Sequence, residues 1–259
     1  MKKAIYALLA SIILILALSC DQHQLNNNML PVTTKSDSAA VHYFNASNIF
    51  HYEGFPGMFE SLEKAVEKDP NFFMAYSLKA AIYDVRGNAE QFEKTAKQAL
   101  DCDIRLNKAE KVWKEILEAK LADSESDVTS ITQKFIELYP DVPEAYVMLG
   151  FYYSQAGDND KAVETYKKAV ELAEDFPGIY NNLGYALMGA ERYEEAGEVL
   201  DKYLEMMPDA PNAHDSKGDY YMAIGDYKSA YESYMKAHEL GWGDRKAQEA
   251  KEKMEEAAR

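Results

Sequence analysis

The sequence has few of the groups that carry out chemistry. Five histidines occur, far apart along the chain and without a cysteine or aspartate at metal-ligand spacing. No serine or cysteine stands in a nucleophile-elbow pattern, and no glycine-rich loop could cradle a phosphate. Carboxylates are abundant, but runs such as Glu194-Glu195 are typical of solvated helix faces rather than of an acid–base pair. We therefore predict a non-catalytic protein that needs no metal or cofactor.

Positive charge and cysteine are scarce as well. There are 28 Lys and Arg against 44 Asp and Glu, which gives a formal net charge of −16. A surface this acidic repels phosphate backbones, so no nucleic-acid partner is expected. The two cysteines are Cys20 and Cys102, and no intramolecular disulfide can form if Cys20 is modified. We interpret Cys102 as a small core residue, with a redox role as the alternative.

Sustained two-residue alternation is also missing, so no β-sheet is expected. What the sequence has instead is a 34-residue repeat, clearest between Pro143 and Gly243. Three consecutive copies share the same pattern of residue types. The matching sets are Tyr146, Leu149, Gly150, Tyr153, Ala162 and Tyr166; Tyr180, Leu183, Gly184, Leu187, Ala196 and Leu200; and His214, Lys217, Gly218, Tyr221, Ala230 and Tyr234. This period indicates stacked helical hairpins, a solenoid in which each unit contacts mainly its neighbours.

These residues resemble the tetratricopeptide (TPR) repeat, with its aromatic positions, Leu-Gly pair, small Ala positions and closing Pro. The resemblance implies an all-α, right-handed superhelical solenoid of about six helix-turn-helix units plus a C-terminal capping helix. The units are 39–72, 73–106, 109–142, 143–176, 177–210 and 211–244, and the cap is 245–259, with a second binding helix as its alternative. The third unit, with Ile116 at the Gly position and Val128 at an Ala position, is expected to pack irregularly.

Glycines mark two kinds of position in these units. Gly87, Gly157 and Gly225 separate the two helices of a unit, where the chain must end a helix and φ can turn positive. Gly150, Gly184 and Gly218 are small residues at which two helices could approach closely.

The N-terminus carries an independent signal. Lys2 and Lys3 precede an apolar run, Ala4 to Leu18, that ends in Ser19-Cys20. A basic start, a short apolar core and small residues before a cleavage point are typical of a secretory signal peptide, here residues 1–19. The run is too short for a confident membrane-spanning helix. The small residue before Cys20 resembles the lipobox of bacterial lipoproteins, which implies acylation of Cys20; an ordinary signal peptide with an incidental cysteine is the alternative.

Residues 20–38 are then predicted to be the lipidated Cys20 and a flexible tether. This places the protein in the bacterial cell envelope, lipid-anchored to the inner or outer membrane and facing the periplasm or the cell surface. Removal of residues 1–19 takes away two lysines and moves the net charge from −16 to −18. Such a charge disfavours an electrostatic hold on anionic lipid, so the acyl chains are expected to be the anchor.

In TPR proteins the first helix of each unit lines a concave face, and the resemblance implies that a partner binds there. The candidates at concave positions are Tyr43, Trp113, Phe151, Asn181, Asn182, Tyr185, Asp215 and Asp219. The implied groove is aromatic in its middle and acidic at its C-terminal end, where it would favour a basic segment. In the alternative interpretation the aromatics fill gaps between units and the asparagines are solvated.

Together these features predict a non-catalytic, membrane-anchored scaffold or adaptor that binds a protein or peptide partner, with envelope complex assembly as one suitable role. The alternative is an accessory lipoprotein of a surface binding or uptake system that holds a small ligand or glycan. Polar and aromatic residues converging on one pocket would favour the alternative. A groove that runs across several units would favour the scaffold.

Overall fold

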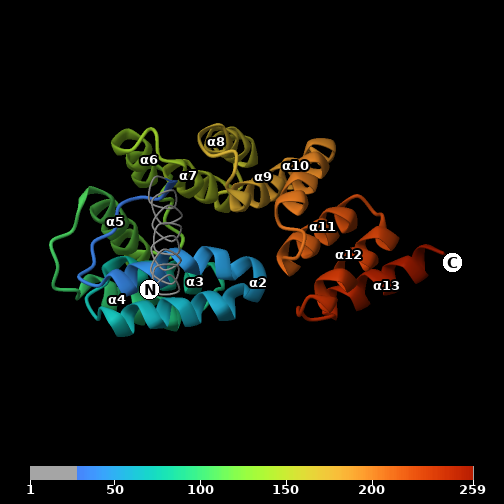
Figure 1. Cartoon of the computed structure of the whole chain (residues 1–259). Coiled ribbons are helices and arrows are strands. Elements are labelled where there is room, and N and C mark those ends of the chain that lie inside the picture. The colour runs from blue at the N-terminus through green and yellow to red at the C-terminus, as the bar shows by residue number, and fades with distance from the viewer. Residues whose placement is uncertain (1–27, 259) are drawn as a thin grey trace, which may run out of the picture.

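The computed structural model describes residues 28–258 of the chain. These residues form helices joined by turns and loops, with no β-strand among them, so the predicted all-α solenoid is confirmed (Figure 1). The signal peptide, Cys20 and the first part of the tether lie outside the described residues. None of the helices in this range has the length and apolar character that crossing a membrane requires.

Residues 37–239 form six consecutive helix pairs, followed by one more helix (Figure 1). The pairs are α2 (Asp37–Lys68), which contains both halves of the first pair; α3 (Phe73–Val85) with α4 (Ala89–Leu100); α5 (Lys108–Ala122) with α6 (Thr129–Leu138); α7 (Pro143–Gln155) with α8 (Asn159–Leu172); α9 (Pro177–Gly189) with α10 (Tyr193–Met206); and α11 (Pro211–Ala223) with α12 (Tyr227–Glu239). The last helix, α13 (Arg245–Ala257), packs on α12 through its buried residues Ala247 and Ala250.

The first pair turns without a separate loop between its two halves. Gly54 has φ 62° and ψ −155°, and this one residue breaks α2 into two halves. The halves fold back on each other, because the Ser61 hydroxyl in the second half donates a hydrogen bond to the His42 carbonyl in the first, at 2.8 Å. Only glycine adopts this backbone conformation without a steric penalty, which explains how the chain reverses in so few residues.

Three of the other turns follow the sequence pattern. Gly87, Gly157 and Gly225 have positive φ values of 67°, 78° and 79°, as predicted. In the fifth pair the equivalent position is Glu191, with a φ of 58°. A left-handed conformation costs a non-glycine residue about 1–2 kcal/mol. This turn is therefore strained where the others are relaxed.

The predicted close helix approaches occur in the three best-matched pairs. A Cβ added at Gly184 would lie 2.5 Å from a methyl carbon of Leu200, and one at Gly218 would lie 2.4 Å from the Tyr234 ring. The third pair lacks such a contact and has Ile116 instead, buried at the Gly position. Its helices are joined by residues 123–128, a loop longer than the three-residue turns of the neighbouring pairs. The expected irregularity of this unit is thus visible in its connection.

The last part of the predicted tether is packed against the solenoid, and this corrects the sequence interpretation. We call residues 29–36 the N-terminal strap. Leu30 is 2% exposed, and its N–H donates to the carboxylate of Glu144 at the start of α7. Further bonds join Thr33 to Glu110, Thr34 and Lys35 to Asp69, and Asn107 to the Pro31 carbonyl. Buried carboxylates that accept main-chain N–H groups hold the strap, a feature that polar composition alone does not reveal.

The helix pairs follow a curve that returns toward its beginning. Figure 1 shows the chain running from α3 and α4 through α5 to α10, then back past α11 to α13. Helix α11 contacts α2. Two hydrogen bonds join the turn of α2 to the C-terminal pairs: His51 Nδ1 lies 2.6 Å from the Tyr203 hydroxyl, and Trp242 Nε1 donates to the Tyr52 carbonyl at 3.2 Å. We call these two bonds the closing contacts.

Candidate binding pocket

A cavity of about 320 Å³ lies on the concave side of the curve. Its walls come from α3, α5, α7 and α9, the first helices of four successive pairs, and from the turn of α2. The lining residues are Phe50, His51, Phe55, Met58, Leu78, Ala81, Ile82, Val85, Trp113, Val147, Met148, Phe151, Tyr152, Phe176, Gly178, Ile179, Asn181 and Asn182. Apolar side chains dominate this set, so the pocket suits an apolar occupant.

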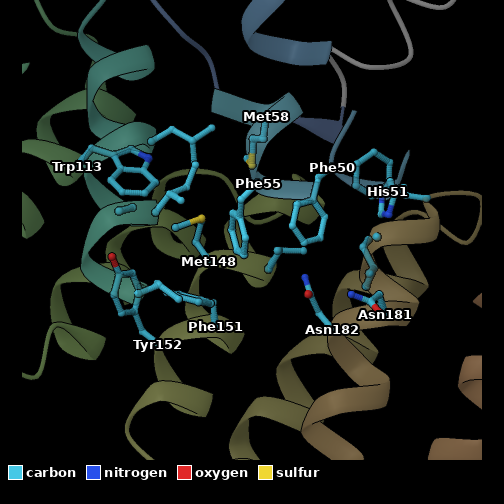
Figure 2. Close-up of a pocket in the computed structure, with 18 residues that line it drawn as sticks. Phe50, His51, Phe55, Met58, Trp113, Met148, Phe151, Tyr152, Asn181 and Asn182 are labelled. Atoms are coloured by element: carbon cyan, nitrogen blue, oxygen red, sulfur yellow. The ribbon is translucent and has the colours of Figure 1, made fainter. Parts of the chain in front are cut away.

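The polar groups of the pocket lie at its ends (Figure 2). Trp113 and Tyr152 stand at one end, and His51, Asn181 and Asn182 stand at the other. Phe55 and Met148 lie between them, with Phe50 and Phe151 completing the apolar middle. An occupant would therefore meet hydrocarbon along most of its length and hydrogen-bonding groups only where it ends.

Trp113 is the best-buried aromatic residue of the pocket. It is 2% exposed and packs against Phe135 with ring centroids 6.1 Å apart. Its Nε1 is buried and has no hydrogen-bond partner among the described residues. A buried N–H without an acceptor costs about 1–3 kcal/mol. Because this N–H is buried, it is enclosed by the protein rather than turned to the open cavity.

The hydrogen bonds around His51 determine where its proton lies. Asn212 Nδ2 donates to the Tyr203 hydroxyl at 2.8 Å, so that hydroxyl is free to donate its own proton to His51 Nδ1. Burial lowers the pKa of His51 to about 4, so the ring is neutral at neutral pH. A neutral imidazole that accepts at Nδ1 carries its proton at Nε2. In this tautomer His51 holds Tyr203 through Nδ1 and keeps its proton on Nε2.

Asn181 connects the pocket to a polar network on α11. Its Oδ1 accepts a hydrogen bond from the Ser216 hydroxyl at 2.8 Å, which leaves the amide N–H groups available for other acceptors. Figure 2 shows the amide nitrogen on the side of Asn182 and the oxygen on the far side. The Tyr185 hydroxyl also reaches this network and donates to Asp219 at 2.6 Å.

The acidic end of the predicted groove already has a counter-charge. Lys246 of α13 forms ion pairs with Asp215 at 2.7 Å and with Asp219 at 2.8 Å. Tyr234 donates a further hydrogen bond to Asp219 at 2.7 Å. Burial raises the pKa of Asp215, and the ion pair with Lys246 opposes that rise. The sequence pattern did not indicate this neutralisation, because Lys246 belongs to the predicted cap rather than to a repeat unit.

The predicted site residues fall into three places. Trp113, Phe151, Asn181 and Asn182 all line the pocket. Tyr185, Asp215 and Asp219 form the neighbouring polar network, with Tyr185 40% exposed. Tyr43 lies apart from both: it is 4% exposed in the N-terminal core, and its ring centroid is 5.2 Å from that of Phe72. Tyr43 is therefore placed to pack rather than to bind.

One wall of the pocket had no sequence signal. Phe50, His51, Phe55 and Met58 come from the turn of α2 and reach the site only because the curve closes. His51 and Tyr203 are separated by 152 positions, and no repeat pattern relates residues that far apart. A contact between the first and fifth pairs depends on the cumulative rotation of the solenoid, which a single sequence does not specify.

Within residues 28–258 no group of three or more His, Cys, Asp or Glu side chains is arranged to hold a metal ion. Burial raises the pKa of Cys102 to about 11, which keeps it a thiol rather than the reactive thiolate.

Consecutive stacked helix pairs of this kind define the class of helical-repeat solenoids. Tetratricopeptide-repeat family models match residues 131–164 and 181–245, and a TPR-repeat model matches 150–189. Residues 131–245 of the chain therefore carry tetratricopeptide repeats, a repeat type that is typical of protein-interaction scaffolds.

Solved structures with a similar fold include three named proteins. MamA MSR-1 C2 is 23% identical with a TM-score of 0.44, covering 65% of this chain and 95% of its own. PilW, described as a widely conserved type IV pilus biogenesis factor, is 17% identical with a TM-score of 0.48, covering 83% and 98%. YrrB, described as a TPR protein with an unusual peptide-binding site, is 17% identical with a TM-score of 0.40, covering 83% and 92%. No curated protein sequence matches the chain.

Proposed function

We propose that this protein is a lipid-anchored scaffold of the bacterial cell envelope that captures a segment of a partner protein in its concave pocket. The observation that carries the proposal is the convergence of four first helices on one apolar cavity. Filling such a cavity with an apolar side chain is favourable, by about 25 cal/mol for each Å² of apolar area removed from water.

The anchor in this proposal is Cys20, supported by the basic start, the apolar run and the small residue before it. Replacing Cys20 by Ser should abolish labelling with a radioactive fatty acid and release the protein from the membrane fraction, or leave its signal peptide uncleaved. Normal acylation of the Cys20→Ser protein would refute the anchor without bearing on the pocket.

Filling the cavity tests the pocket. Ala81 of α3 lines it, so Ala81→Phe should place a phenyl ring inside and block the occupant. The matched control is Ala89→Phe, which adds the same group at an exposed position of α4. Photo-crosslinking in intact cells should recover a partner with the wild type and the control, but much less with Ala81→Phe. Equal recovery with a folded Ala81→Phe protein would place the binding surface elsewhere.

The convergence on one pocket also supports the alternative function of holding a small ligand. The apolar lining argues against a glycan, whose hydroxyl groups need many polar partners. A small apolar molecule would be revealed by mass spectrometry of organic extracts of the purified protein. Its presence in the wild type and absence from Ala81→Phe, with no crosslinked partner, would favour the alternative.

A further inference from the structure

A second apolar hollow, of about 500 Å³, lies beside the N-terminal strap and shares no lining residue with the concave pocket. Its walls come from the strap, from α2 and from the residue before α7. Five apolar residues of these walls keep part of their surface open to solvent, and we call them the strap face: Met29, Pro31, Val32, Phe44 and Val142. An apolar surface that the protein itself leaves uncovered is typical of a contact site.

The main chain of the strap is already bonded to the solenoid beside the start of α5 (Figure 1). The Thr33 N–H donates to Glu110 at 2.5 Å, and the Asn107 side chain donates to the Pro31 carbonyl at 3.0 Å. Polar main-chain groups that are satisfied in this way do not need water. The strap can therefore present its outward side chains to an apolar phase without leaving these groups unpaired.

Positive charge gathers next to the strap face, although the chain as a whole is acidic. Residues 29–36 and the segment 105–111 that bonds to them contain four basic residues and one acid, Glu110, which is fully buried. Asp37 and Asp103 are the exposed acids that adjoin these segments, and they balance only half of this charge. The four basic residues are exposed, and none of them pairs with a carboxylate within residues 28–258: Lys35, Arg105, Lys108 and Lys111.

The chain also leads from the strap face toward the proposed anchor. Met29, which lines the hollow, is nine residue-to-residue steps from Cys20. An acylated Cys20 would hold this side of the solenoid next to the bilayer. Apolar side chains bordered by Lys and Arg suit an anionic membrane, because the apolar groups enter the headgroup boundary while the cations meet lipid phosphates.

We propose that the strap face docks on the surface of an anionic bilayer, with Met29, Pro31 and Val32 at the headgroup boundary and the four basic residues against lipid phosphates. This inference rests on the proposed function, since the acylated Cys20 supplies the membrane attachment that the strap face extends. It departs from the expectation based on net charge, because the charge of the whole chain does not describe this face. Two attachments, one covalent and one through the strap face, would fix the orientation of the solenoid on the membrane.

The first test measures vesicle flotation of the full mature chain without its lipid, residues 20–259 carrying Cys20→Ser. This chain should float with vesicles of phosphatidylglycerol and phosphatidylethanolamine at low salt, and much less with phosphatidylcholine alone. Lys108→Gln combined with Lys111→Gln should weaken the partition into anionic vesicles about 10- to 30-fold, since each cation near such a surface contributes roughly 5-fold.

The matched control is Lys228→Gln combined with Lys251→Gln, which removes the same charge from exposed positions of α12 and α13. This control should float like the parent chain. Equal losses in the two double variants, equal flotation with anionic and neutral vesicles, or no flotation at low salt would each overturn the inference.

The second test asks whether the apolar side chains reach the hydrocarbon. In the same chain, the added indole of Met29→Trp should be quenched by brominated acyl chains when anionic vesicles are added, after subtraction of the signal from Trp113 and Trp242. Glu125→Trp places the same reporter in the loop between α5 and α6 and should not be quenched. Equal quenching of the two reporters, or none at position 29, would contradict insertion of the strap face.

These outcomes can be separated from those of the proposed function. Both assays use a chain that cannot be acylated, so a negative result would overturn the strap face and leave the lipid anchor and the pocket intact. A wild-type protein that is not acylated in cells would refute the anchor without changing the result of either vesicle assay.

Discussion

The two halves of this chain are built from the same kind of unit but hold together differently. From Leu30 to Tyr152 the buried residues form one continuous core that includes the strap, α2 and α7. After that point the core divides into small clusters shared by adjacent pairs. The C-terminal half is thus a solenoid with neighbour contacts, while the N-terminal half packs as a globular domain does. The pocket lies where the two kinds of packing meet.

Cutting the chain between the halves should produce the largest effect. A fragment of residues 141–259 keeps its neighbour contacts and should melt cooperatively, as solenoid segments do. A fragment of residues 39–140 loses the strap and α7, which belong to its core, and should be largely unfolded. Extending it to 29–158 should restore a cooperative transition in circular dichroism. If 39–140 melts like 29–158, the strap and α7 contribute little and the distinction between the halves fails.

Acid should weaken the contact between the two halves by protonating His51, which is hydrogen-bonded to Tyr203. Its pKa is about 4 in the folded protein against an ordinary 6.5, so the unfolded chain binds the proton first. This contribution to stability is fully present above pH 6.5 and is lost as the pH falls to about 4, by roughly 3 kcal/mol. His51→Asn keeps an acceptor for Tyr203 but cannot titrate. Urea denaturation at pH 7 and pH 4.5 should show a smaller loss for His51→Asn than for the wild type, and equal losses would disprove the assignment.

A rise in pH from acid to neutral should weaken the N-terminal half through Glu144. Burial raises the pKa of Glu144 from 4.5 to about 7. The hydrogen bond from the Leu30 N–H favours the charged carboxylate and opposes this rise. The folded protein therefore holds a proton that the unfolded chain has released, and stability falls by up to about 3 kcal/mol as the pH rises from 4.5 to 7. Glu144→Gln retains an acceptor for Leu30 and should become more stable than the wild type above pH 7, with little difference at pH 4.

A matched substitution keeps that test specific. Glu194→Gln removes a carboxylate that is exposed on α10, and its difference from the wild type should not grow with pH. If Glu144→Gln and Glu194→Gln change stability alike at every pH, Glu144 titrates normally and does not hold the strap as described.

The smallest effect should come from the one strained turn of the regular half. Glu191→Gly removes a side chain from a residue with φ 58° and should stabilise the protein by about 1 kcal/mol. Glu198→Gly makes the same substitution inside α10, where φ is helical, and should destabilise it by about 1 kcal/mol. Opposite shifts of the melting temperature are expected; a loss in both variants would mean that Glu191 makes a contact worth more than its strain.

Sequence reasoning worked where structure depends on nearby residues. The positive-φ glycines, the close approach at Gly184 and the irregular third pair all reflect contacts within one period. Contacts between segments that are far apart in the sequence could not be predicted in this way. No repeat relates the segments joined by three such contacts: the strap bonded to Glu144, the turn of α2 over the pocket, and the ion pairs of Lys246. Half of the predicted site residues line the pocket, and the wall facing them was not predicted.

The strap also sets how far the solenoid can move from the proposed anchor. Only ten residue-to-residue steps lead from Cys20 to Leu30, whose N–H is bound to Glu144. A fully extended chain of that length spans about 35 Å at most. A linker this short would keep the pocket within a thin layer next to the membrane surface. In that layer the effective concentration of a partner in the same membrane would reach about the millimolar range. A pocket of modest intrinsic affinity would then suffice for partners in that membrane, while proteins diffusing freely would pass largely unbound.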